Sequence, residues 1–354
     1  IAMYMSRLFL VRTFAVLAAL LLILQTLDLL GESGKILAHP GNGQAELWHY
    51  VTLRAPQIVA RFLPFSVLLG TIITLATLNQ NSEIVSMKAA GLSAHQILAP
   101  LIVAAIMVAG ISFAFNDRIV SRATATLKRW EKIEFAPLPK DPMALADVWV
   151  RDGNNLINAG MVLGHGATTR LENVTIYTRN GGALLSVLNA KDAVQTNGAW
   201  TIRGVRFFDV ATGVAKPQAN TLVGKGIRPE QFTLATVEPD GLSFQRLWAA
   251  INNLQAAGRP TLSLRSVLWH KISGPLSTVL MPLLGAVAAF GIARSGKLFI
   301  RTIIGMSLGF AYFVADNFGL AMGNLGAYPP LLAAWGPFLL FLLIGEFVLL
   351  KTEE

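Results

Sequence analysis

Six apolar stretches alternate with polar segments along the chain, three before and three after a long polar middle part. They lie near residues 8–30, 58–78, 97–116, 270–292, 301–321 and 331–350. About 20 residues at a rise of 1.5 Å match the roughly 30 Å hydrocarbon core of a bilayer, so each stretch is long enough, or nearly so, to cross a membrane as a helix. The pattern predicts an α-helical integral membrane protein with six transmembrane helices in a three-plus-three arrangement.

The polar middle segment contains short runs rich in Val, Ile, Thr and aromatic residues between about 140 and 240, which are typical of strands. The expected strands cover residues 147–150, 173–178, 184–188 and 200–209. The dipeptides that would close hairpins are Asp152-Gly153, Asn180-Gly181 and Asn197-Gly198. An inserted all-β domain, a β sandwich or jelly roll of about 100 residues, is therefore expected, with helices over 117–133 and 243–257 on either side.

These patterns divide the chain into three parts. Residues 1–116 carry transmembrane helices 1–3, residues 117–269 form the polar segment with the β domain, and residues 270–354 carry transmembrane helices 4–6. In the helix predicted after the β domain, one face is shared by Leu247, Trp248, Ile251 and Leu254.

Composition agrees with a membrane protein. Hydrophobic residues make up 53% of the chain and charged residues only 14%, against about 25% charged residues in an ordinary soluble domain. The first apolar stretch is long and lacks an evident cleavage site, so it is interpreted as a retained helix, with Met3 or Met5 as the native start. The net charge of +9 comes without any nucleic-acid-binding motif, so anionic lipid is the favoured partner and nucleic acid is not.

The distribution of Lys and Arg over the short loops predicts the orientation. Six spans place both termini on one side, together with the loops near 79–96 and 293–300. The basic residues on that side are Arg7, Lys88, Arg294, Lys297 and Lys351, whereas the opposite short loop, 322–330, has none. The positive-inside rule therefore places both termini in the cytoplasm and the β domain outside it.

The cytoplasmic loop after the second span predicts a short helix at about 81–92. Asn81 or Ser82 can cap it, Glu83 lies in its first turn, and Gly91 is a natural stop. A solvated connector is the simpler interpretation. The functional interpretation is a coupling helix that docks into a cytoplasmic motor.

Basic residues gather beyond the third span. Arg118, Arg122 and Arg129 fall on nearly one face of a helix, and Lys35 beyond the first span would lie at the same depth. They are either ordinary interfacial anchors or a cationic rim that grips lipid phosphates.

Two features of the fifth span also have two interpretations. Gly305 and Gly309 form a G-x-x-x-G that allows a close helix approach, either within the chain or between subunits. Asp316 is costly in hydrocarbon, so it should face protein or water, either as a functional group or as a hydrogen-bonded structural carboxylate.

Motifs of catalysis or metal binding are not found in the sequence. The five histidines are scattered, and the run GIARSGK at 291–297 lacks the Ser or Thr that completes a phosphate-binding loop. A lipid-modifying membrane enzyme would need clustered titratable groups, for which Asp316 with Glu346 is the one pair to consider. A periplasmic scaffold is the remaining alternative.

Several runs together resemble one family over essentially the whole chain. They are SEIVSMKAAGLS in the cytoplasmic loop, VWVRDGNNLINA at 148–159, and FVADNFG followed by Tyr328-Pro329-Pro330. With the three-plus-three layout, they resemble the LptF/LptG permease family of the lipopolysaccharide export system, the LptG-type half more than the LptF-type half.

This resemblance implies one half of an inner-membrane ABC transporter of a Gram-negative bacterium, which extracts lipopolysaccharide and passes it to a periplasmic bridge. The implied partners are an LptF-type paralogue, two copies of an LptB-type ATPase and a single-span LptC-type protein. ATP and Mg would be used by the ATPase, with no cofactor bound by this chain.

The resemblance also implies roles for particular residues. The ATPase-coupling residues would be Glu83, Ile84, Met87, Ala90 and Leu92. Lipid phosphates would meet Lys35, Arg118 and Arg122. The contact with the paired permease would include Gly305 and Gly309.

Overall fold

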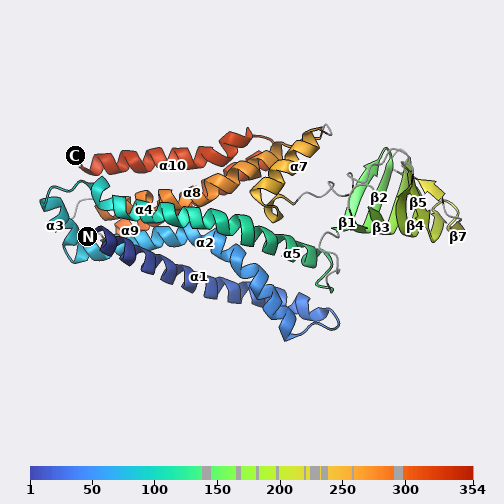
Figure 1. The fold of residues 1–354 in the computed structure, drawn as a ribbon, viewed down its shortest axis with the longest axis horizontal. Helices are drawn as coiled ribbons and strands as arrows, with labels where there is room; N and C mark the ends of the chain where they lie inside the picture. The colour runs from blue at the N-terminus through green and yellow to red at the C-terminus, as the bar shows by residue number, and fades with distance from the viewer. Residues whose placement is uncertain are drawn as a thin grey trace. The chain divides into compact units, whose positions relative to one another are not determined.

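The computed structural model describes residues 1–137, 145–164, 169–180, 183–196, 199–218, 221–223, 232, 238–256, 259–290 and 298–353. The chain forms two compact units. One comprises residues 1–34, 42–125 and 239–354, and the other comprises residues 35–41 and 126–238. The first is a helical bundle and the second contains the β domain (Figure 1).

The helices follow the predicted order, and several of them extend beyond the predicted apolar stretches. They are α1 (Ala2–Ala38), α2 (Gln44–Gln80), α3 (Glu83–Ala89), α4 (Ala94–Phe115), a π-helical turn (Asn116–Val120), α5 (Ser121–Lys132), α7 (Phe244–Ala256), α8 (Leu262–Phe290), α9 (Leu298–Asn324) and α10 (Pro330–Glu353). Five helical stretches of the described chain are long and apolar enough to cross a membrane: Ala2–Ala38, Gln44–Gln80, Ala94–Lys132, Ile303–Asn324 and Pro330–Lys351. They match the first, second, third, fifth and sixth predicted spans. The fourth, 270–292, coincides with α8, which is not among these five, and its last two residues lie outside the described part.

The first two spans are much longer as helices than as apolar stretches. Each of α1 and α2 has 37 residues, which corresponds to about 56 Å at 1.5 Å per residue and exceeds a bilayer core. Residues 31–57, which lie between the first two predicted spans, are therefore mostly helix, and residues 39–43 connect α1 to α2. Hydropathy detects the part of a helix that lies in hydrocarbon, whereas the backbone hydrogen bonds continue into its polar ends.

Helix α8 is central in the bundle, because it packs against α2, α4, α9 and α10. The core around it contains fully buried leucines, such as Leu68 of α2, Leu98 of α4 and Leu284 of α8. Helix α7 contributes Leu247, Ile251 and Leu254, which are buried as one face. Trp248, which was grouped with them from the sequence, is instead 48% exposed.

The second unit contains the predicted antiparallel β domain. Its strands are β1 (Leu145–Asp152), β2 (Asn155–Leu163), β3 (Arg170–Asn180), β4 (Ala183–Thr196), β5 (Ala199–Arg203), β6 (Val205–Asp209), β7 (Val214–Gln218) and β8 (Thr221–Val223). They form one hydrogen-bonded sheet in the order β1-β2-β3-β4-β5-β8, in which β6 pairs with a second part of β4 and with β7. One apolar cluster, including Val148, Ile176 and Trp200, forms the core of this domain.

One row of residues across the sheet interrupts the regular alternation of buried and exposed positions. The pairing skips Asp147, Gly160, Asn173 and Lys191, which lie at matching positions of β1 to β4, and Gly204, which lies between β5 and β6. Three of them, Asp147, Asn173 and Gly204, have positive φ angles of 49°, 53° and 65°. A Cβ on Gly160 would lie only 3.0 Å from the Cβ of Asn173, so a larger residue would strain the contact.

The row shifts the buried positions by one residue in each strand that it crosses. Buried residues on its two sides are separated by three positions: Ala159 and Val162, Leu171 and Val174, Ala190 and Ala193, and Ile202 and Val205. The first three pairs lie on β2, β3 and β4, and the fourth runs from β5 to β6. Because the shift occurs at the same place in each, the apolar face stays continuous across the interruption.

The strand predictions are confirmed with two corrections. Strands β2, β7 and β8 were not assigned from the sequence. The hairpin turn before β2 was predicted at Gly153, which has the positive φ of 58° that such a turn requires. The strand expected over 200–209 is two strands, because Gly204 separates β5 from β6 and lets both pair with β4. The glycines of the other two predicted turn pairs, Gly181 and Gly198, lie outside the described residues.

Candidate functional site

The predicted coupling helix is present as α3. Gly91 ends it as predicted, with a φ of 87° and an N–H that donates to the carbonyl of Lys88 at 2.9 Å. Ser82 precedes the helix as expected, but its φ is 59° and its side chain makes no capping hydrogen bond. Helix α3 therefore begins without the side-chain cap that the sequence predicts.

The residues predicted to dock the ATPase differ in exposure, and their contact with it stays a prediction. Ile84 and Met87 are 4% and 8% exposed and belong to the apolar core of the bundle. Because they are three residues apart, they lie on the same face of α3 and anchor this face to the core of the bundle. Their side chains therefore expose little surface in the single chain. Ala90 is exposed as predicted, and Leu92 is half-buried against the same core. Val85, which the sequence reasoning did not include, is 53% exposed on the outer side.

Glu83 is half-buried at the start of α3, where the helix dipole favours a negative charge. Its Oε1 atom lies 3.4 Å from the Tyr4 hydroxyl and 3.4 Å from Nδ2 of Asn81. Both are long contacts in exposed surroundings, so they hold the carboxylate only weakly. The carboxylate thus remains available to a stronger cationic partner.

Two further interactions lie at the start of α4, which follows α3 in the chain. Ser93 and Gln96 form a reciprocal cap at the start of α4, with distances of 3.2 and 3.0 Å, one turn after Gly91. His95 in the same turn lies 2.7 Å from Oε1 of Glu346 near the end of α10. The cap follows from the S-x-x-Q spacing, which the sequence analysis overlooked. The His95–Glu346 pair could not be predicted from local pattern, because 251 positions separate the two residues.

The predicted phosphate-binding residues are all exposed. Arg118 lies in the π-helical turn and Arg122 four residues later in α5, on the same continuous helix. Lys35 lies near the end of α1 and belongs to the other compact unit. The structure thus brings Arg118 and Arg122 together on one helix, and the participation of Lys35 stays a prediction.

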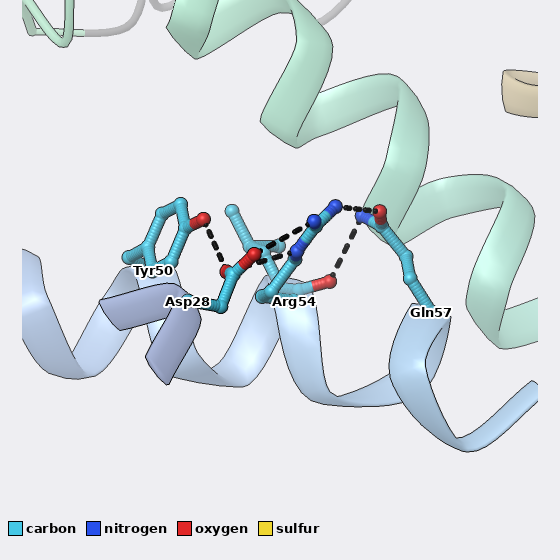
Figure 2. A network of polar contacts seen from close by, with 5 residues as sticks. Asp28, Tyr50, Arg54 and Gln57 are labelled. Atoms are coloured by element: carbon cyan, nitrogen blue, oxygen red, sulfur yellow. Dashed lines mark hydrogen bonds and ion pairs between the residues drawn. The ribbon is translucent and has the colours of Figure 1, made fainter. Parts of the chain in front are cut away.

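A polar network between α1 and α2 was not predicted from the sequence (Figure 2). Asp28 accepts two hydrogen bonds from the Arg54 guanidinium, at 2.8 and 3.0 Å, and one from the Tyr50 hydroxyl at 2.6 Å. Arg54 also donates to Gln57 at 3.1 Å. The two-point contact neutralises the Arg54 charge within the chain, which distinguishes this residue from the exposed arginines.

The predicted interface glycines face the interior of this chain. Gly305 and Gly309 are both buried. A Cβ on Gly309 would overlap the side chain of Leu68 on α2, so this glycine permits close packing of α9 against α2. The structure favours internal packing for Gly309, and a contact with a second subunit stays a prediction.

The two membrane carboxylates do not form one site. Asp316 Oδ2 lies 2.9 Å from Nε2 of His270, whereas Glu346 contacts His95. Within the described residues, His, Asp and Glu form no cluster of three that could hold a metal ion. The GIARSGK run lies outside the described residues. The paired carboxylates that the enzyme alternative requires are therefore not brought together.

Comparison with known proteins gives a consistent result. A sequence model of the family described as Lipopolysaccharide export system permease LptF/LptG matches residues 3–351. The lipopolysaccharide export system permease protein LptG of Escherichia coli K12 is 26% identical over 312 residues, which cover 86% of this chain and 85% of the relative. The protein of the same name from Haemophilus influenzae is 23% identical over 333 residues, or 89% of each chain. Because the family match takes in almost the whole sequence, this chain belongs to the LptF/LptG family of lipopolysaccharide export permeases.

Proposed function

We propose that this chain is the LptG-type half of an inner-membrane ABC transporter that extracts lipopolysaccharide and delivers it to a periplasmic bridge. The observation that carries the proposal is the family match over residues 3–351. The two relatives described above are both named LptG, which favours this half over the LptF-type half. The membrane-spanning helices and the inserted antiparallel sheet support the same assignment.

The proposed complex contains an LptF-type paralogue, two LptB-type ATPases and one LptC-type protein. Both termini and α3 would lie in the cytoplasm, and the β domain in the periplasm, where it would join the partners' β domains. The excess of basic residues in the short loops on one side supports this orientation.

The physical demand of the reaction is to hold several acyl chains outside the bilayer. Each buried CH₂ contributes about 0.8 kcal/mol, so exposing several chains to water would cost tens of kcal/mol, and the transport cavity must be apolar. Large apolar side chains of α1 and α9 are exposed in the single chain and would supply such a wall together with the paired permease. They include Phe14, Leu22, Leu30, Phe310, Val314 and Phe318. Arg118 and Arg122 would meet the phosphates above it.

The force for expulsion would enter at α3. Ile84 and Met87 fix this helix to the bundle core, the short loop 90–93 connects it to α4, and the His95–Glu346 pair joins α4 to α10. A displacement of α3 by an ATPase would therefore move these helices as one rigid group. Closure of the two halves would push the lipid out of the cavity.

Replacing Lys35, Arg118 and Arg122 together with Ala is expected to lower the yield of lipopolysaccharide cross-linking several-fold. The triple variant removes three positive charges that would contact phosphate, each through a charge-assisted hydrogen bond. The measurement is photo-cross-linking to radiolabelled lipopolysaccharide in vesicles containing the whole complex. Arg7→Ala at the opposite end of α1 is the control for loss of an exposed charge and should leave the yield unchanged. An undiminished yield in the triple variant would leave the three residues as interfacial anchors.

The decisive test of the proposed function is capture of a soluble ATPase. The chain, co-expressed with its paralogue in its native host and purified in mild detergent, should retain a cytoplasmic ATPase and release lipopolysaccharide from vesicles only with ATP. A lipid-modifying enzyme or a periplasmic scaffold requires no such subunit. Purification without any ATPase, in a complex that contains both permeases, would refute the proposal.

A further inference from the structure

The contact between α8 and α9 contains a seam of polar side chains that the transport roles above do not use. On α8 it consists of Ser266, His270, Ser273 and Ser277. At 100° per residue, these four positions fall within an arc of about 60° on one helix face. The three serines are at most 3% exposed, and the His270 side chain is 25% exposed.

Three contacts show that this face meets one face of α9. Ser266 lies against Gly323, since its Oγ is 2.7 Å from the position of a Cβ on that glycine. His270 contacts Asp316 at 2.9 Å. Ser277 lies near the Tyr312 hydroxyl. Residue numbers rise along α8 as they fall along α9, so the three contacts form one continuous antiparallel seam.

Three polar atoms of this seam make no hydrogen bond of good geometry among the described residues, although the Tyr312 hydroxyl lies near Ser277. They are Asp316 Oδ1, the Tyr312 hydroxyl and Ser273 Oγ. Tyr312 is 3% exposed and Ser273 is 1% exposed, so solvent outside the bundle does not satisfy them. The ring of Tyr312 packs edge-on against Phe341 at 5.5 Å, which restricts the direction of its hydroxyl. Buried polar atoms almost always have a partner, which is often an ordered water with about three hydrogen bonds.

We propose that α8 and α9 enclose a bound water molecule at this seam. The water would donate a hydrogen bond to Asp316 Oδ1, accept one from the Tyr312 hydroxyl, and share a third with Ser273 Oγ. A neutral ligand fits better than a cation. The other oxygen of Asp316 already contacts His270, and water can both donate to a carboxylate and accept from a hydroxyl, as these three atoms require.

The bound water has a structural consequence for α9. It completes the hydrogen bonds of a carboxylate that is otherwise costly inside a membrane protein. Asp316 can then remain a fixed link between α8 and α9, together with His270. The proposal does not depend on the substrate or on the ATPase, so it stands or fails independently of the transport function.

Variants that lack a single hydroxyl group test the proposal, because the melting temperature is expected to fall if a water is bound and to stay the same or rise if it is not. If the three atoms were simply unsatisfied, Tyr312→Phe and Ser273→Ala would each remove a poorly placed polar group, and the melting temperature would stay the same or rise. With a bridging water, each variant deprives the water of a partner, and the melting temperature should fall by about 2 to 4 °C. The measurement is thermal unfolding of the purified transporter complex in detergent.

Two further comparisons complete the test. Tyr328→Phe removes a hydroxyl from an exposed tyrosine on the loop between α9 and α10 and should leave the melting temperature unchanged. The double variant Tyr312→Phe with Ser273→Ala should lose less than the sum of the two single losses, since both act on the same water. An unchanged or higher melting temperature in both single variants would overturn the proposal. So would a high-resolution map of the complex in which the Tyr312 hydroxyl bonds directly to Asp316 without density for a water.

Discussion

Glu83→Ala is expected to abolish most lipopolysaccharide release while leaving the fold of the permease intact. Among the residues that the structure describes, the Glu83 carboxylate makes two contacts, both of 3.4 Å and on an exposed surface, so its removal should change the free energy of unfolding by no more than about 0.5 kcal/mol. At an interface with the proposed ATPase, loss of one member of a buried charge pair costs roughly 2 to 5 kcal/mol. That corresponds to at least a tenfold loss of affinity, because 1.4 kcal/mol is about a factor of ten. The measurements are the amount of ATPase that co-purifies and the ATP-dependent release of lipopolysaccharide.

A neighbouring residue separates docking from folding. Ile84→Ala removes a side chain that is 4% exposed in the bundle core, so it should lower the free energy of unfolding by about 2 to 5 kcal/mol. Glu83→Ala should instead reduce ATPase binding at an unchanged melting temperature. Normal ATPase retention and normal release in Glu83→Ala would exclude the coupling role.

Gly70→Ala is expected to disrupt the contact between α1 and α2. A Cβ at this position would lie 2.9 Å from both the backbone nitrogen and the Cα of Thr13. Backbone atoms cannot move away as a flexible side chain can, so α1 itself would have to shift. Overpacking of a core lowers the free energy of unfolding by about 1 to 3 kcal/mol. Because α1 would be displaced, we expect a loss at the upper end of that range for Gly70→Ala. The measurement is thermal unfolding of the permease pair in detergent.

Gly110→Ala on α4 is the matched control for this change. A Cβ on Gly110 meets nothing within 4 Å, and Ala favours a helix over Gly by up to about 1 kcal/mol. The control variant should therefore unfold at the same or a higher temperature. If Gly70→Ala behaves like Gly110→Ala, the close approach of α1 to α2 is not required for stability.

The sequence by itself determined the features that depend on neighbouring residues. Hydropathy identifies a membrane span within about 20 residues, and turn pairs such as Asp152-Gly153 mark a hairpin locally. The stop of α3 at Gly91 followed in the same way, because an L residue rarely adopts the φ of 87° found there. Family membership was also predicted correctly from the order of short motifs.

The tertiary structure decided which side of each element is used. The resemblance to the permease family assigned Ile84 and Met87 to a docking surface, because it carries over positions in a motif and not the packing of their side chains. Only the position of the bundle shows that this face is buried. Likewise, Gly204 divides an expected strand only because β5 and β6 must both pair with β4.

Polar pairs within the bundle were equally inaccessible to local pattern. His95 meets Glu346, and His270 meets Asp316, across 251 and 46 positions of the chain. No periodicity indicates which carboxylate a histidine contacts, because the choice depends on how the helices pack. Local sequence fixed the helices, strands and turns through hydrophobicity and backbone preference. The packing of these elements fixed the partners, because a buried charge or hydroxyl must be satisfied by whatever group the fold places beside it.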